Sequence, residues 1–443
     1  MKIAILGYGV EGKAVEKYFQ SHPFIDSEQN LNVSPDELEL TVFDKFTADK
    51  LPDLSDFDIV FRSPSVRPPV RPDAFELLKN PNLIPAKPLW TSSTRYFYDH
   101  VDRQHIIGIT GTKGKGTTCS IATAILKNLG YRVHLVGNIG TPAIETLDSI
   151  AAEPDEKYFI VYEMSSFQLW DLEKSPHVAA ILRISPDHLD IHRGFNDYAQ
   201  AKSNIARHQA PGDYCIYYAN NADSVKIAEA SDGELISYPL AENRVWLDQL
   251  LDNLQIPGTH NRENAEAALE VVAAALRLSL EQLVDTYHDQ LTQTLRDFKA
   301  LPHRIQFIRE LNHVKYYDDN YSSALPATEV AIKTFSDQPV ILIAGGKDRH
   351  LNLDGHKKAF FASPNVKKVI LIGELKQQLA NGISPEKYEF ADTLPEAVNK
   401  ARFEAERFDT TIVLMSPGAA SFDMFQNFGD RGDQFQAIVQ ELQ

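Results

Sequence analysis

The chain has 443 residues, more than one ordinary hydrophobic core can organise, so two to four domains are expected. Its composition (43% hydrophobic, 24% charged) is that of a globular protein, without an apolar run near the ~20 residues of a membrane span, and its net charge of −17 argues against nucleic-acid binding. Cys119 and Cys215 form neither a disulfide framework nor a zinc spacing, and the N-terminus has no cleavage site, so a cytoplasmic location is expected.

Residues 1–92 predict half of a doubly wound α/β fold. The expected elements are strands Lys2 to Leu6, Leu38 to Phe43 and Asp58 to Phe61, and a helix from Ala14 to Phe19. The turn Gly7-Tyr8-Gly9-Val10-Glu11-Gly12 matches the dinucleotide-binding fingerprint, but Asp44 lies well beyond the ~20-residue spacing of a ribose-binding acid. NAD, another nucleotide and a structural turn all stay open here. Pro81 to Pro88 is predicted to pass to the next domain.

A glycine-rich turn between a strand and a helix is the most informative feature of the chain. Gly108 to Thr118 follows the apolar run His105 to Ile109 and precedes a helical run, Ser120 to Leu129. Such a turn binds polyphosphate through backbone N–H groups and a helix N-terminus, with Lys115 reaching the outer phosphates and Thr117 or Thr118 serving Mg²⁺. The strict Walker pattern is not met, because five residues separate Gly108 from Gly114 and Gly116 stands where Ser or Thr is usual. We predict ATP binding at this turn.

Polar residues follow other expected strands of this second domain, residues 93–300. These strands are Arg132 to Val136, Tyr158 to Tyr162, Ala179 to Ile184 and Tyr214 to Tyr217, with a late helix from Ala265 to Leu276. Asn138 and Glu163 lie at two of the strand ends, and Glu163 beside nucleotide phosphates is a natural ligand for Mg²⁺, which prefers oxygen. His188 follows the third strand and is equally well explained as a packed histidine. Lys202, judged locally, is predicted to be a surface lysine.

A break at Lys299-Ala300-Leu301-Pro302 predicts a third domain, residues 301–443, again of parallel α/β pattern. Its expected strands are His313 to Tyr317, Val340 to Ala344, Val369 to Ile372 and Thr411 to Met415. Three of them are followed by polar turns: Asp318 to Ser323, Ala344 to Arg349 and Ser416 to Asp423. Polar turns at the ends of adjacent parallel strands predict a ligand crevice.

Taken together, these residues resemble the Mur ligase family over nearly the whole chain. The most specific matches are Glu163 to Leu169, Asp187-His188-Leu189-Asp190, Gly258 to Asn264, His303-Arg304, and Ser416 to Phe428 followed by Arg431-Gly432-Asp433. The resemblance implies a Rossmann-like first domain that holds a UDP-sugar, a central P-loop ATPase domain with a mostly parallel sheet, and a Rossmann-like third domain. It also implies ATP-dependent amide formation through an acyl phosphate, closest to the members that add D-glutamate to UDP-N-acetylmuramoyl-L-alanine in peptidoglycan synthesis, as a monomer with two Mg²⁺ ions.

The resemblance assigns a role to each matching position. Lys115, His188 and Lys202 are the implied catalytic residues, and Glu163, His188 and a carbamylated Lys202 are the implied metal ligands, with Asn138 near the first ion. Implied nucleotide-binding residues are Gly111, Thr112, Gly114, Lys115, Gly116, Thr117, Thr118, Asn264, Arg304 and Asp319. Implied substrate-binding residues are Gly9, Val10, Asp44, Lys45, Ser63, Asn138, Ser323, Arg349, Ser421 and Phe428.

The sequence departs from the family pattern at several of these places. The third-domain motif, usually Asp-Ser-Lys-Ala-Thr, reads Asp319-Asn320-Tyr321-Ser322-Ser323, so a lysine near the amino-acid and phosphate sites has become Tyr321. A Mur-type ligase with another amino acid or acceptor is therefore the first alternative. A folylpolyglutamate-synthase-like ligase, a catalytically inactive nucleotide-binding subunit and an NAD oxidoreductase are the others.

Overall fold

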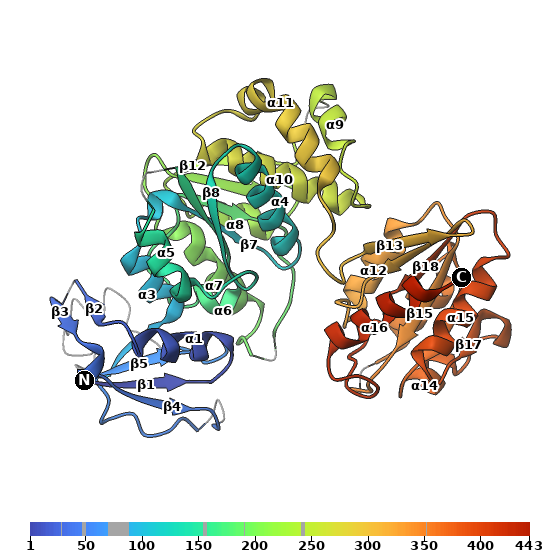
Figure 1. Ribbon diagram of the computed structural model, residues 1–443, viewed down its shortest axis with the longest axis horizontal. Coiled ribbons are helices and arrows are strands. Elements are labelled where there is room, and N and C mark those ends of the chain that lie inside the picture. Colours follow the sequence, from blue (N-terminus) through green and yellow to red (C-terminus); the bar gives the residue numbers. More distant parts are fainter. Residues whose placement is uncertain are drawn as a thin grey trace. The chain divides into compact units, whose positions relative to one another are not determined.

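The protein is described by a computed structural model that covers residues 1–27, 29–46, 50–69, 88–153, 157–189, 191–240, 244–350 and 352–443. The chain forms two compact units, one of Met1–Asn253 with Glu263–Leu295 and one of Leu254–Arg262 with Arg296–Gln443 (Figure 1). The passage predicted at Pro81 to Pro88 lies almost entirely outside the described residues. None of the described helices combines the length and apolar composition that a membrane crossing needs.

The first unit begins with a small parallel sheet in the order β4-β1-β5-β6. Its strands are β1 (Lys2–Leu6), β4 (Glu39–Phe43), β5 (Ile59–Arg62) and β6 (Leu89–Ser92). Helix α1 (Val10–Phe19) packs on it through Ala14, Val15 and Phe19. Sequence analysis missed β6 and the hairpin β2 (Phe24–Asp26) and β3 (Leu31–Val33), because three- or four-residue strands give too little periodicity to read.

The larger sheet of the first unit has six parallel strands in the order β12-β11-β10-β7-β9-β8. Their bounds are β7 (Ile106–Thr110), β8 (Arg132–Gly137), β9 (Tyr158–Glu163), β10 (Val178–Ile181), β11 (Tyr214–Tyr218) and β12 (Glu234–Tyr238). Its helices are α3 (Ser93–His100), α4 (Lys115–Asn128), α5 (Leu147–Ala151), α6 (Ser166–Leu169), α7 (Phe195–Arg207), α8 (Ala222–Ala228), α9 (Val245–Leu251), α10 (Thr259–Ala275) and α11 (Leu280–Asp297).

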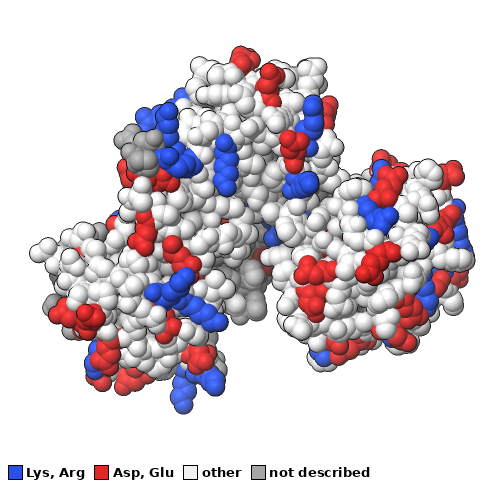
Figure 2. All heavy atoms as spheres, in the orientation of Figure 1, with Lys and Arg blue, Asp and Glu red and all other residues white. Residues whose placement is uncertain are grey.

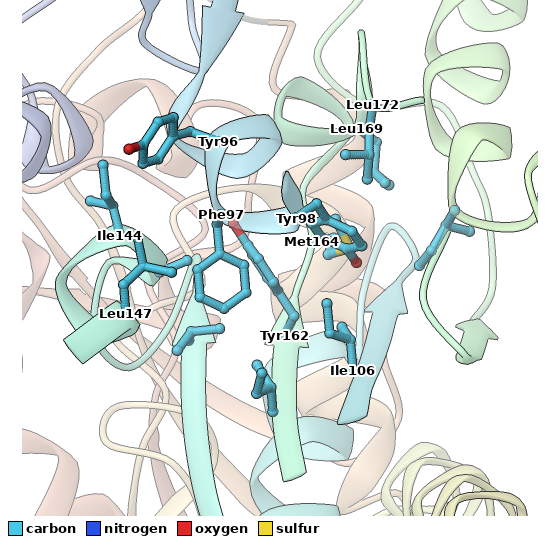
Figure 3. Packing of buried hydrophobic residues seen from close by; sticks show 14 of the residues in the cluster. Tyr96, Phe97, Tyr98, Ile106, Ile144, Leu147, Tyr162, Met164, Leu169 and Leu172 are labelled. Carbon is cyan, nitrogen blue, oxygen red and sulfur yellow. The ribbon is translucent and has the colours of Figure 1, made fainter. Parts of the chain in front are cut away.

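Aromatic residues of α3 join the cores of these two sheets. The Tyr96 ring contacts Phe19 and Phe61 of the small sheet at 5.2 and 5.8 Å between ring centroids. Phe97 and Tyr98 instead pack on Tyr162 of β9, at 5.7 and 6.0 Å, and Figure 3 shows Tyr162 between them while Tyr96 points away. The result is one continuous hydrophobic core, so the two sheets belong to one compact unit.

The second unit contains a six-stranded sheet in the order β13-β14-β18-β15-β16-β17. Its strands are β13 (Gln306–Leu311), β14 (Val314–Asp318), β15 (Val340–Gly345), β16 (Val366–Ile372), β17 (Tyr388–Phe390) and β18 (Thr411–Met415), and its helices α12 (Leu325–Thr334), α13 (Asp354–Ala362), α14 (Lys376–Ala380), α15 (Leu394–Ala405) and α16 (Phe428–Glu441). The expectation of a purely parallel pattern is wrong at one edge, where β13 pairs antiparallel with β14, because a tight turn at Asn312 and His313, both at positive φ, reverses the chain.

The α/β fold class predicted from the sequence is confirmed, and each sheet falls within one of the three predicted domains. The boundaries at 92 and 300 stay a prediction. On the face shown in Figure 2, Lys and Arg side chains are interspersed with Asp and Glu in both units.

Candidate active site

Strand register in the first unit gathers the polar loops that the sequence analysis singled out. Thr110 of β7 pairs with Ile181 of β10, and Ile109 pairs with Glu163 of β9. Glu163 in turn pairs with Gly137 of β8. Because all four strands are parallel, their carboxyl ends lie along one edge of the sheet, and the loops that follow them are neighbours.

The phosphate loop lies between β7 and α4. Helix α4 begins at Lys115, five residues before the predicted start at Ser120, because the first N–H groups of a helix need no partner inside it and poor helix formers are tolerated there. Gly114 has φ +89°, and a Cβ there would come within 2.3 Å of Asn264 Oδ1 from α10. The structure thus brings Asn264 against the loop. The Lys115 ammonium donates to the carbonyls of Gly111 and Thr112 at 3.1 and 3.2 Å.

Thr112 bonds the phosphate loop to neighbouring segments of the first unit. Its hydroxyl lies 2.9 Å from both the Ser185 carbonyl and the Tyr198 hydroxyl, and its N–H donates to the Arg183 carbonyl. Gly116 and Thr118 are buried in the first turn of α4, and Thr117 is half-buried. Thr118 Oγ1 has no hydrogen-bond partner among the described residues, although it is buried.

Glu163 combines burial with an unsatisfied oxygen. The residue is 2% exposed, and its Oε1 accepts a 3.1 Å hydrogen bond from Asn138 Nδ2. Its Oε2 is also buried and has no partner within the described part of the chain. Buried carboxylate oxygens are costly when unpaired, so this atom fits a hard cation that brings the missing interaction.

Lys202 is buried, and the local prediction of a surface lysine is wrong. It is 1% exposed, and its Nζ donates to Thr110 Oγ1 at 3.1 Å and to the Gly111 carbonyl at 2.9 Å. Burial, with the Lys115 charge nearby, holds the pKa of the Lys202 ammonium well below its ordinary value. The signal was available in the helical spacing, because Tyr198, Ala201 and Ile205 are buried beside it on one face of α7.

His188 and the loop around it lie at the surface. The His188 side chain is 50% exposed and meets the Phe167 ring edge-on at 5.1 Å. Asp190 of the same motif lies outside the described residues. No three His, Cys, Asp or Glu side chains converge into a metal cluster in the part of the chain that the structure describes.

Three residues missed by the sequence analysis anchor this loop. His192 is buried, with Nε2 3.0 Å from Ser166 Oγ and Nδ1 3.2 Å from Asp197 Oδ2. Burial lowers the pKa of His192, which favours the neutral ring. Asp197, in the first turn of α7, also accepts two hydrogen bonds from Arg67 at 2.8 and 2.6 Å. Of these three residues, Arg67, which follows β5, is the one whose contact with Asp197 has no local sequence signal.

The glycine turn of the first sheet is tightly packed at the end of β1. A Cβ on Gly12 would lie 2.1 Å from the Gly7 carbonyl oxygen, and Ser63 Oγ donates to that oxygen at 2.6 Å. Gly9 and Val10 are exposed, as are Asp44 and Lys45 after β4. Of the predicted residues outside the turn, Ser63 is the one that bonds directly to it in the described part of the chain.

The second unit places three predicted loops at the ends of β14, β18 and β15. Asp319 is buried, and its carboxylate accepts hydrogen bonds from Ser416 Oγ at 2.6 Å and from the Ile305 N–H at 3.2 Å. Burial raises the pKa of Asp319 to about 7. Ser323, Arg349 and Phe428 are exposed, whereas Ser421 is 2% exposed.

Arg304 lies over Tyr321, its guanidinium carbon 3.9 Å from the ring centroid, and the same ring meets Phe428 at 5.0 Å. The structure therefore brings Arg304 and Phe428 together on the residue that replaces the family lysine.

Comparisons with known proteins place this geometry in a family. Residues 109–272 match the family model of the Mur ligase middle domain. UDP-N-acetylmuramoylalanine–D-glutamate ligases of Clostridium kluyveri and Thermoanaerobacter pseudethanolicus are 31% and 33% identical to the chain, over all of it and over 97% and 98% of their own lengths. The chain belongs to the Mur ligase family.

Solved structures agree with this assignment at the level of the fold. The UDP-N-acetylmuramoylalanyl-D-glutamyl-2,6-diaminopimelate–D-alanyl-D-alanyl ligase of Acinetobacter baumannii superimposes with a TM-score of 0.59 at 20% identity, covering 79% of this chain and 78% of its own. A MurF ligase of Thermotoga maritima, solved with ADP, gives 0.55 at 16% identity, covering 87% and 90%.

In this Mur ligase, the departures at Asn320 and Tyr321 have visible structural consequences. Asn320 is fully buried and accepts a 2.6 Å hydrogen bond from Arg431 Nε, while its own amide donates to Asp318 Oδ1 at 2.7 Å. Arg431 is also fully buried, and burial lowers the pKa of its guanidinium to about 10. Asn320, which precedes Tyr321 in the chain, thus takes part in a buried polar network with Arg431 and Asp318.

Proposed function

We propose that this Mur ligase joins D-glutamate to UDP-N-acetylmuramoyl-L-alanine with hydrolysis of ATP, in the cytoplasmic synthesis of peptidoglycan precursors. The observation that carries the proposal is the match to D-glutamate ligases over the whole chain. The convergence of Lys115, Glu163 and Lys202 at one sheet edge supports it. The muramoyl-alanine carboxylate attacks the γ-phosphate and displaces ADP. The D-glutamate amine then attacks the carbonyl of the acyl phosphate, loses a proton and displaces phosphate.

Lys115 and Glu163 have separate proposed roles at the phosphate loop. Lys115 and the N–H groups around Gly114 to Thr118 bind the ATP phosphates and offset their charge. Glu163, with Thr118 beside the loop, would hold Mg²⁺, since the buried Oε2 and Oγ1 atoms both lack partners among the described residues. The ion supplies electrostatic stabilisation of the transferring phosphoryl group.

Lys202 suits the role of a second oxygen ligand after carbamylation. A neutral amine adds to CO₂ with loss of one proton and becomes an anionic carbamate, and the lowered pKa of Lys202 increases the neutral fraction of its amine. His188, exposed on its loop, completes the proposed pair of ligands.

The remaining predicted residues divide between the two substrates. The UDP-sugar is bound by the residues at the strand ends of the first sheet: Gly9, Val10, Asp44, Lys45 and Ser63. Asn138, the other residue assigned to this substrate, also orients the Glu163 carboxylate. Asn264, Arg304 and Asp319 serve the nucleotide, while Ser323, Arg349, Ser421 and Phe428 serve the incoming amino acid. We propose that these tasks fall to three domains, 1–92, 93–300 and 301–443, of a monomeric enzyme.

The test is phosphate release from ATP and Mg²⁺ with UDP-N-acetylmuramoyl-L-alanine and single amino acids. Release with D-glutamate alone is the expected result. Release with a different amino acid would show that this amino acid, and not D-glutamate, is the substrate. Tyr321 is the residue that motivates this alternative. If no amino acid gives phosphate release, either UDP-N-acetylmuramoyl-L-alanine is not the acceptor or the protein is not an active ligase.

Lys115→Ala is expected to abolish this turnover, because the other cation of the loop, Lys113, is 67% exposed and lies 3.8 Å from Asp187. Lys113→Ala is the matched control and should remain active. Near-normal turnover of Lys115→Ala would remove Lys115 from the proposed mechanism.

A further inference from the structure

Tyr321 and Arg304 form a contact that the proposed reaction does not yet explain. The Arg304 guanidinium carbon lies 3.9 Å from the centre of the Tyr321 ring, well inside the ~6 Å range of a cation–π interaction. Arg304 pairs with no carboxylate among the residues that the structure describes. Its charge is therefore available to an anion, while the ring occupies one face of the guanidinium.

The Tyr321 ring contacts the side chains of Arg304 and Phe428, and the Tyr321 backbone is bonded to His303. The Tyr321 N–H donates to the His303 carbonyl at 3.0 Å, which ties the loop after β14 to the segment that carries Arg304. Phe428, the first residue of α16, meets the ring edge-on at 5.0 Å. Tyr321 remains 44% exposed and Phe428 41% exposed, so the cluster is fixed but faces solvent.

A buried network beneath the cluster fixes the backbone that carries it. Asn320 bonds to Arg431, one turn into the same helix that begins at Phe428. Asp318 accepts from Asn320 and lies 2.7 Å from His303 Nδ1, next to Arg304 in the chain. The loop, the segment and the helix are therefore joined to one another by polar contacts that exclude independent movement of Tyr321.

We propose that Tyr321 is a positioning residue for Arg304, whose guanidinium is held on the ring in the orientation that binds the nucleotide. This proposal rests on the proposed function, which assigns Arg304 to the nucleotide. Arg304 belongs to a motif that matches the family, so the replacement of the usual lysine by Tyr321 removes one cation from this cluster and leaves the cation of Arg304 on the ring. An aromatic ring serves this purpose, whereas a second cation beside Arg304 would repel it.

Equilibrium binding of ATP with Mg²⁺, measured by calorimetry on the full chain, tests the proposal. Tyr321→Phe should bind within about twofold of the unmodified protein, because the ring face is retained. Tyr321→Leu should bind about two- to fivefold more weakly, the loss expected for an exposed cation–π contact. Tyr321→Lys should bind at least as weakly as Tyr321→Leu, although it restores the residue usual in the family.

Phe403→Leu is the matched control. Phe403 is an exposed residue of α15, away from the strand-end loops, and the Arg407 guanidinium carbon lies 5.3 Å from the centre of its ring. Its ATP affinity should be unchanged. Equal affinity of Tyr321→Leu and Tyr321→Phe, or tighter binding by Tyr321→Lys, would overturn the proposal. Circular dichroism of each variant separates lost binding from lost folding.

Steady-state kinetics separate this proposal from the proposed function. If the unmodified protein turns over D-glutamate, Tyr321→Leu should raise the KM for ATP and leave the KM for D-glutamate unchanged. A change confined to the KM for D-glutamate would assign Tyr321 to the amino-acid pocket and refute the positioning role. If the unmodified protein is inactive with D-glutamate, the proposed function fails, while the ATP-binding series still decides the role of Tyr321.

Discussion

At the scale of single residues, the candidate site contains polar atoms that burial has left in unusual states. Within the described residues, Lys202 is a buried amine with no carboxylate at hydrogen-bond distance, and Glu163 is a buried carboxyl group with one oxygen that lacks a partner. Each would be destabilising in a structure selected only for stability, because a buried charge without a partner costs free energy. Their presence at one sheet edge indicates that a ligand or a chemical modification supplies the missing interactions.

Lys202→Ala is expected to lose activity and to recover part of it in acetate or formate, since these carboxylates can replace the oxygen ligand of a carbamate. Turnover measured against added carboxylate checks the rescue, with Lys174→Ala, a surface lysine paired with Asp99, as the unaffected control. Absence of rescue, together with full activity of the unmodified enzyme in CO₂-free buffer, would contradict the carbamate.

Asn138→Ala is expected to raise the Mg²⁺ concentration for half-maximal activity about 10- to 100-fold, because the amide no longer orients the Glu163 carboxylate. A Mg²⁺ titration of turnover measures the effect. Asn128→Ala also removes an amide donor, from α4 to α11, and should leave the titration unchanged. An unchanged curve for Asn138→Ala would show that Asn138 does not support the ion.

At the scale of elements, helix α7 connects the phosphate loop to the small sheet. Lys202 and Tyr198 on its buried face reach the loop, and Asp197 in its first turn binds both Arg67 and His192. Although burial opposes ionisation, the hydrogen bonds from Arg67 and from the Arg193 N–H lower the pKa of Asp197 to about 2. The first turn of α7 is thus held by a carboxylate that stays ionised over most of the acidic range.

The Asp197 contribution to stability should be lost only at low pH. A carboxyl whose pKa is depressed on folding contributes fully above its unfolded pKa, near 3.8, and loses the contribution as the pH falls toward 2. The urea midpoint of Asp197→Asn should therefore lie below that of the unmodified protein from pH 5 to 8, and the gap should narrow below pH 4. A gap independent of pH would show that the carboxylate charge is not the stabilising feature.

At the scale of the molecule, the first unit is held together by ion pairs as well as by the aromatic core. Arg62, at the end of β5, is buried and bonds to Asp171 beyond α6, with Nε 2.9 Å from Oδ2. Gln168 of α6 likewise donates to Glu11 of α1 at 2.7 Å. Burial raises the pKa of Glu11, and the hydrogen bond from Gln168 opposes that rise. These contacts connect the glycine turn to the loop that follows Glu163.

Asp171→Ala is expected to lower the free energy of unfolding of the first unit by about 3–5 kcal/mol, because it leaves Arg62 buried and unpaired. Chemical denaturation followed by tryptophan fluorescence measures the change. The double variant Arg62→Met with Asp171→Leu removes both charges and should recover most of the loss. A double variant as unstable as Asp171→Ala would show that packing, rather than the unpaired charge, sets the cost.

The sequence by itself determined the features that depend on short segments. The strand–turn–helix around Lys115, most strands of the three sheets and the polar turns after them were predicted within a few residues, because apolar runs and glycine positions encode them locally. Strands β6, β12, β13 and β17 were not predicted. Within these turns, Glu163, Asn138 and Asp319 were identified from their places at strand ends. The family resemblance then supplied roles that no local pattern contains.

Only the tertiary structure decided which of these residues are buried and what they contact. Lys202 meets the Gly111 carbonyl 91 positions away, and Arg62 meets Asp171 across 109 positions. The stacking of Arg304 on Tyr321 likewise depends on the pairing of β13 with β14. Such contacts follow from strand order and packing rather than from neighbouring residues, and burial of a charge has no meaning until the elements that exclude water from it are in place.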